Sequence, residues 1–216
     1  MKPVRIILIA FGIPLAVLAL LYLILPKALT SIERNEFNAI NALNQIVDAE
    51  IVWHHQGAIG KPEQKYWVYD VSCLNRIYHS DNIIKIAYIP ESIALADAKP
   101  FNALQNDILL RNGFWAEALK EKNKPKSGYW FQAMSQDESG APYCQKSRDT
   151  NKIMPFNDSR FAFVAFPDDY SSTGNRTFIV NEKQIIHARN MGSDKTKFVR
   201  QWPSEQELET KWEVVD

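Results

Sequence analysis

The chain has 216 residues, with 25 basic and 25 acidic side chains, so its formal net charge is zero. No long block of either sign occurs, which argues against nucleic acid or another polyanion as a partner. With 46% hydrophobic and 12% aromatic residues, the composition is typical of a folded protein and excludes an intrinsically disordered chain.

The first feature along the chain is an apolar run from Ile6 to Leu25, which contains no charged residue. A helix of this length spans about 30 Å, the hydrocarbon thickness of a bilayer. The run therefore predicts a transmembrane helix at 6–25 in contact with the lipid bilayer, after a cytoplasmic tail at 1–5. One alternative is a cleaved signal peptide, which needs a shorter apolar core and small residues before the cut. The other is a buried core helix, which seldom stays uncharged over this length.

After Pro26 the apolar residues recur at helical spacing, which predicts an amphipathic helix that continues the membrane helix into a domain at 26–216. The segment from Gly57 to Pro62 ends this helix, because glycine favours the C-cap and proline prevents continuation. The apolar stripe of the helix consists of Ile32, Ala39, Ile40, Leu43, Val47 and Ile51.

In the second half of the chain the apolar period changes to two, which is typical of strands. Strands are predicted at 128–134, 160–166, 176–180 and 184–189, and the last two form a hairpin around Asn181 to Lys183. Trp202 and Trp212 are expected to fix the C-terminal tail on the domain. The predicted fold class is α+β, with the long helix packed on a C-terminal antiparallel sheet.

Cys73 and Cys144 are the only two cysteines. In an oxidising compartment an even pair predicts a disulfide. Closing a loop of about 70 residues would restrict the unfolded chain by about 4 kcal/mol in the entropy model. The alternative is two independent buried thiols.

Asp168 and Asp169 begin an oxygen-rich loop that also contains Ser171, Ser172 and Asn175. Calcium prefers six to eight oxygen ligands, so the two aspartates are weak candidates for a calcium site. The alternative is an ordinary turn, because the loop lacks EF-hand spacing and these residue types also favour turns. The sequence has no Gly-x-Ser-x-Gly and no glycine-rich phosphate loop, so it predicts no catalytic or cofactor-binding residue and no enzyme.

Several short motifs together resemble type IV pilins and type II secretion pseudopilins, and most closely a bacterial pilin-like group of unassigned function. The first is the run from Glu36 to Ile46, which is similar to the part of the pilin helix that leaves the membrane. The others lie in the C-terminal half: Gly128 to Phe131, Phe163 to Pro167, Thr173 to Glu182, and Trp202-Pro203. The resemblance covers about two-thirds of the chain and implies a pilin-like α+β fold.

The chain departs from that family at its N-terminus. When the sequence is aligned on Pro26, Val4, Arg5 and Ile9 occupy the family's glycine, aromatic and glutamate positions. Without these residues we expect no prepilin cleavage and a retained anchor. The resemblance then implies a membrane-anchored, non-enzymatic ectodomain that binds or scaffolds envelope or secretion proteins. One alternative is a minor pseudopilin of a type II secretion or type IV pilus system, and another is a periplasmic enzyme of unknown type.

The expected location is the bacterial inner membrane, with a single pass, a cytoplasmic N-terminus and a periplasmic domain. Lysine and arginine counts on the two sides of the span are nearly equal and do not fix this orientation. The short N-terminal tail and the two cysteines favour it.

Overall fold

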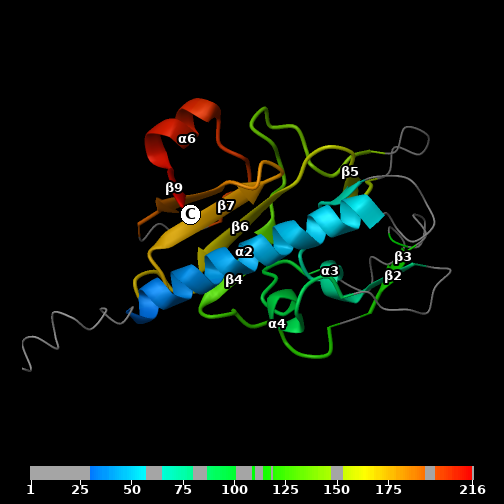
Figure 1. The fold of residues 1–216 in the computed structure, drawn as a ribbon, viewed down its shortest axis with the longest axis horizontal. Helices are drawn as coiled ribbons and strands as arrows, with labels where there is room; N and C mark the ends of the chain where they lie inside the picture. Colours follow the sequence, from blue (N-terminus) through cyan, green and yellow to red (C-terminus); the bar gives the residue numbers. More distant parts are fainter. Residues whose placement is uncertain are drawn as a thin grey trace, which may run out of the picture. The chain divides into compact units, whose positions relative to one another are not determined.

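A computed structural model describes residues 30–56, 65–79, 87–100, 109, 114–117, 119–146, 153–192 and 198–215. Residues Ser31–Asp216 form one compact unit. Its longest element is helix α2 (Ser31–Gln56), which runs beside a five-stranded sheet (Figure 1).

Helix α2 is amphipathic because residues three and four apart in its sequence share one face. The apolar members of the buried face are Ala39, Ala42, Leu43, Ile46, Val47, Ala49 and Trp53. Glu33, Arg34 and Asp48 lie on the exposed face. Of the predicted stripe, Ala39, Leu43 and Val47 are buried, whereas Ile32, Ile40 and Ile51 are half-buried at its edge.

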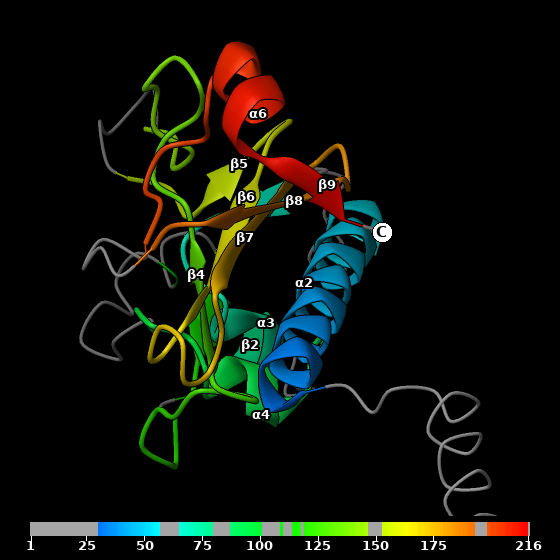
Figure 2. The ribbon, with the colours of Figure 1, turned by 90° about the vertical axis from the view of Figure 1, so that its left-hand side faces the viewer.

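The five-stranded sheet has the order β4-β6-β7-β8-β9, and every neighbouring pair is antiparallel (Figures 1 and 2). The central strands β6 and β7 are buried on both faces, whereas the burial of β4 and β8 alternates along the strand. The strands are β4 (Tyr129–Ala133), β6 (Ala162–Pro167), β7 (Arg176–Asn181), β8 (Ile186–Asn190) and β9 (Glu213–Val215).

The inner face of the sheet is the one that α2 contacts, at β4, β6 and β7. In register across the strands, this face carries Phe131, Ala165, Phe178, Ala188 and Glu213. On each strand the residue adjacent to an inner-face residue points to the outer face. In register, the outer face carries Gln132, Val164, Ile179, His187 and Val214. Helix α6 (Glu205–Lys211) lies over the outer face, since Arg189 of β8 contacts Glu207 and His187 contacts Trp202.

The remaining described elements are short and cover the other parts of the core. Strands β1 (Tyr66–Trp67) and β5 (Phe156–Asn157) pair with each other, as do β2 (Ile77–His79) and β3 (Phe114–Ala116). The short helices α3 (Cys73–Arg76) and α4 (Glu91–Ala94) contact one another.

Glu36 connects the start of α2 to the sheet. Its carboxylate accepts hydrogen bonds from the backbone N–H groups of Asn175 and Arg176 and from Arg176 Nε at 2.7 Å. Arg176 also donates to Glu213 of β9 at 2.7 Å. Gly174 lies next to this contact. A larger residue does not fit there, because its Cβ would overlap the hydroxyl group of Tyr129.

The expected fold class and location need correction. The predicted fold class required a transmembrane helix that continues into the domain. The predicted location required single-pass insertion in the inner membrane and a periplasmic domain. In the described part of the chain, no helix has both the length and the apolar character needed to cross a bilayer. Helix α2 cannot do so because its exposed face carries charges. The expected tail at 1–5 and span from Ile6 to Leu25 lie outside the described residues.

The expected disulfide was also wrong, because Cys73 and Cys144 are both free thiols. Cys73 begins α3 inside the core, and burial raises the pKa of its thiol well above the ordinary value. The half-buried thiol of Cys144 instead contacts the carbonyl oxygen of Val68 at 3.7 Å. Burial raises the pKa of Cys144 to about 11, so neither cysteine is a reactive thiolate at neutral pH.

Candidate functional site

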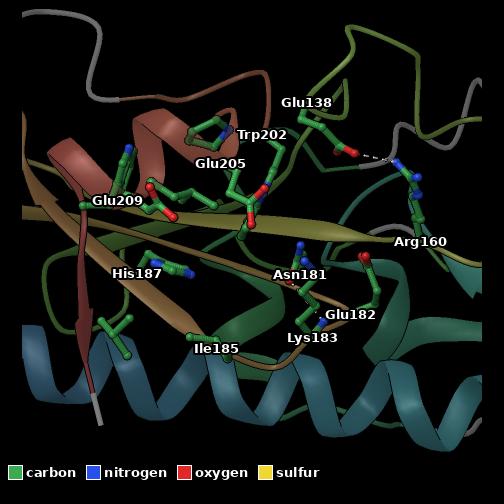
Figure 3. Close-up of a pocket in the computed structure, with 14 residues that line it drawn as sticks. Glu138, Arg160, Asn181, Glu182, Lys183, Ile185, His187, Trp202, Glu205 and Glu209 are labelled. Carbon is green, nitrogen blue, oxygen red and sulfur yellow. Dashed lines mark hydrogen bonds and ion pairs between the residues drawn. The ribbon is translucent and has the colours of Figure 1, made fainter.

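A groove of about 650 Å³ opens between helix α6 and the outer face of the sheet (Figure 3). Its volume lies within the range of small-molecule and cofactor pockets, about 300–1,000 Å³. We call it the α6 groove. Its lining residues come from the turn after β4, the residues just before β6, the β7–β8 hairpin, the segment before α6, α6 with the residue after it, and β9: Glu138, Arg160, Asn181, Glu182, Lys183, Ile185, His187, Trp202, Pro203, Glu205, Leu208, Glu209, Trp212 and Val214.

The apolar part of the α6 groove combines buried tryptophans with exposed aliphatic side chains. Trp202 and Trp212 are 6% and 8% exposed and belong to the core. Ile185 and Val214 are 45% and 62% exposed, so the groove presents apolar surface to solvent. All four lie beside β8 or β9, so the sheet and the C-terminal tail form this surface together.

His187 lies on the outer face of β8, directly opposite Val214 of β9. Its ring meets Trp202 edge to face, with 6.1 Å between ring centroids. The Nδ1 atom is buried and has no hydrogen-bond partner among the described residues. Burial, together with the charge of Lys183, lowers the pKa of His187 below its ordinary value, so the imidazole is neutral at pH 7.

Trp212 follows helix α6 and caps its C-terminal end. Arg189 lies over its ring, with the guanidinium carbon 5.9 Å from the ring centroid. The indole Nε1 is buried and donates to no residue that the structure describes. A buried donor without a partner costs about 1–3 kcal/mol, so this atom is a position where an acceptor would be stabilising.

The charged residues around the α6 groove are unequal in sign. Four acidic and two basic side chains line it among the described residues. Arg160 is already engaged by Asp137 at 3.0 Å and by Glu138 at 3.1 Å. Figure 3 shows the pair with Glu138. The remaining charge of the groove is therefore mostly negative.

The calcium candidates lie elsewhere. The Asp168 carboxylate accepts a hydrogen bond from the Trp130 indole at 2.7 Å, and the Asp169 backbone closes a turn with Thr173. Among the described residues, no three His, Cys, Asp or Glu side chains are grouped so that they could hold a metal ion. The backbone between Asp169 and Thr173 forms a turn, and the calcium site stays a prediction.

A second group of buried acids, Asp70 and Asp97, contacts the segment that leads into α3. Asp97 accepts hydrogen bonds from the backbone N–H groups of Val71, Ser72 and Lys99, each at 2.8 Å. Asp70 accepts from Ser72 and from the Trp67 indole. These contacts hold the segment 67–76 in place, and we assign them a structural role.

The sequence did not identify the α6 groove. Trp202 and Trp212 were expected only to fix the C-terminal tail, and His187 had no assigned role. The period of two does place Ile185 and His187 on one face, but it does not show that α6 covers that face.

Residues 108–215 match the model of a family described as a protein of unknown function (DUF2950). This interval is half of the chain and contains every residue that lines the α6 groove. The match is not to a pilin or pseudopilin family, so that resemblance gains no support from it. No curated protein and no solved structure matches the chain.

Proposed function

Because the chain belongs to the DUF2950 family, for which no function is known, we propose its function from the geometry: it is a non-enzymatic binding module. Its ligand is an extended segment of a partner protein, which lies in the α6 groove beside β9. The observation that carries this proposal is an open groove next to the edge of β9, which no strand of the described residues occupies.

The two edges of the five-stranded sheet differ. The outer edge of β4 is covered, because Phe131 exchanges backbone hydrogen bonds with Ala96 and Ala98 at 2.9 and 2.8 Å. No strand of the described residues pairs with the outer edge of β9. Proteins commonly recognise extended peptides by adding them as a further strand to an exposed sheet edge, with side-chain pockets alongside for specificity.

The side chains next to β9 fit such a ligand. Val214 is the residue of β9 that faces the groove, and Ile185, which immediately precedes β8, lines the same groove. Exposed apolar side chains at the rim of a groove mark interaction sites more often than isolated ones do. A bound strand would pair with the free edge of β9 and cover the exposed side chain of Val214.

Selection of a random twelve-residue peptide display library against the full chain tests this proposal. The affinity of the selected peptides is measured by fluorescence anisotropy. Replacing Val214→Ser should weaken binding about tenfold, because covering a valine contributes about 1.5–3 kcal/mol and a factor of ten is about 1.4 kcal/mol. The melting temperature should stay unchanged because the side chain is exposed in the free protein.

Ile153→Ser is the matched control. Ile153 is also an exposed large apolar residue, 50% exposed, but it does not line the groove. It should leave the affinity unchanged. Failure to select any binding peptide, or equal losses of affinity in the two variants, would contradict the proposal.

The alternative function, a minor pseudopilin, stays a prediction that no described contact favours.

A further inference from the structure

We propose that the α6 groove holds its ligand only while His187 is uncharged, so that the bound segment is released as the pH falls below neutral. This inference rests on the proposed function, because it names the regulation of the site that binds the segment. It is carried by the position of His187 in the groove, by the burial of one of its ring nitrogens, and by the lack of an acidic partner for the ring among the described residues.

His187 lies where a bound segment would cover it (Figure 3). The side chain is half-buried, lines the groove, and lies directly opposite Val214, the exposed residue of β9. A segment that pairs with the free edge of β9 and lies in the groove would remove water from the exposed part of the imidazole. Binding therefore continues the burial that the fold has already begun at this ring.

The surroundings of the ring suit the neutral imidazole and not the imidazolium. Neutral imidazole has one nitrogen without a hydrogen, whereas imidazolium donates from both nitrogens. Nδ1 of His187 is buried and has no hydrogen-bond partner within the described part of the chain. Trp202, whose ring centroid is 6.1 Å away, offers no acceptor because its indole nitrogen only donates. The charged ring would therefore place a donor and a positive charge where water does not reach them, which is costly.

The charged groups around the ring do not reverse this preference. Arg189, on the same face of β8, pairs with Glu207 of α6 at 3.2 Å, and Glu213 of β9 lies on the inner face. His187 itself forms no ion pair with a residue that the structure describes. Burial, and then the charge of Lys183, lower the pKa of its imidazole below the ordinary value. The charged residues that line the groove with it are Glu138, Arg160, Glu182, Lys183, Glu205 and Glu209.

Linkage gives the direction of the pH effect. A bound segment that buries the imidazole further lowers the pKa of His187 in the complex, so the complex binds fewer protons than the free protein. Release of the segment then takes up a proton and becomes more favourable as the pH falls. Affinity should be constant above pH 7 and should decrease below the ordinary histidine pKa of about 6.5.

The test uses the full chain and a selected peptide that has blocked termini and no histidine, aspartate or glutamate. Its dissociation constant, measured by fluorescence anisotropy with a pH-insensitive label, should rise about fivefold from pH 7.5 to pH 5, since one linked proton changes affinity at most tenfold per pH unit. NMR of isotope-labelled histidine rings gives the pKa of His187 directly. Saturation with the peptide should lower this pKa.

The variant His187→Gln, which carries a neutral polar side chain, should bind the peptide equally at pH 7.5 and pH 5. His55→Gln is the matched control and should keep the pH dependence, because His55 is exposed at the end of α2 and does not line the groove.

An affinity of the unaltered protein that does not change with pH, or a pH dependence that persists in His187→Gln, would overturn the inference and leave the proposed function standing. If His187→Gln does not fold, the NMR titration decides, and a pKa of His187 that the peptide leaves unchanged or raises would overturn the inference. If no peptide is selected, the proposed function fails and the inference fails with it.

Discussion

Glu50 lies in the core near the end of α2, and its side chain has no exposed surface. Its Oε2 accepts the backbone N–H of Trp67 at 2.8 Å, and its Oε1 has no hydrogen-bond partner among the described residues. Burial is the main reason that the pKa of Glu50 lies well above the ordinary value, and the charge of Asp70 raises it further. The hydrogen bond from Trp67 lowers the pKa but does not offset the burial. The carboxyl group is therefore protonated in the folded protein at pH values where the unfolded chain has already lost that proton.

This difference predicts a pH-dependent stability. Where the folded state binds more protons than the unfolded state, the free energy of unfolding falls as pH rises. For Glu50 this decrease begins near the ordinary glutamate pKa of about 4.3 and continues up to the raised pKa of the folded protein. Glu50→Gln should flatten the curve above pH 5, because the variant has no carboxyl group to titrate at this position. Urea unfolding at several pH values measures this.

Glu91→Gln serves as the control because Glu91 is exposed at the start of α4. It should leave the pH curve unchanged. Asp97, whose pKa burial raises to about 7, contributes equally to the unaltered protein and to both variants, so it does not affect the comparison. If the two variants show the same slope, Glu50 is not the source of the pH dependence.

At the scale of elements, the contact between α2 and the sheet contains much of the core. Leu43 and Ile46 of α2 have no exposed surface, and neither do Phe163 and Phe178 of the sheet. These side chains belong to one continuous hydrophobic cluster. The polar connection made by Glu36 and Arg176 lies at the start of the same helix, so hydrogen bonds fix the register of α2 while apolar burial holds it in place.

We therefore expect Leu43→Asp to lower the stability of the full chain by several kcal/mol, because an unpaired charge would be buried in the core. Asn44→Asp adds the same charge at the next residue, which is exposed, and should change stability by less than about 0.5 kcal/mol. Thermal and urea unfolding of both variants measure the difference. Equal melting temperatures would mean that this face of α2 does not contact the sheet.

At the scale of the whole molecule, the family match and the structural unit have different extents. The match covers 108–215, whereas the compact unit is Ser31–Asp216. The matched interval contains all five strands of the sheet but not α2, which covers its inner face. A sheet with one apolar face needs such a cover, because large exposed apolar patches are unstable in water and promote aggregation.

A fragment comprising residues 108–216 should therefore not fold by itself. We expect aggregation or no cooperative thermal transition, since its inner-face aromatic residues would be exposed. A fragment comprising residues 31–216 should melt in one cooperative step and is the control. Circular dichroism at increasing temperature distinguishes the two outcomes. A cooperative transition for residues 108–216 would show that the matched interval is an independent domain.

Periodicity alone located the regular elements of the second half of the chain. The predicted strands at 128–134, 160–166, 176–180 and 184–189 lie within two residues of β4, β6, β7 and β8 at each end. The turn around Asn181 to Lys183 was also placed correctly, because short polar turns between alternating strands have strong local preferences. These features depend on neighbours along the chain, so they can be read without knowing the tertiary structure.

Tertiary contacts decided what the sequence pattern could not show. Glu36 and Glu50 are polar, yet both are buried because Arg176 and the Trp67 backbone meet them across the fold. Cys73 and Cys144 remain free thiols, since spacing in the sequence does not fix the distance between two side chains. The α6 groove exists only because the C-terminal helix returns over the outer face of the sheet, and a period of two identifies a face without showing what covers it.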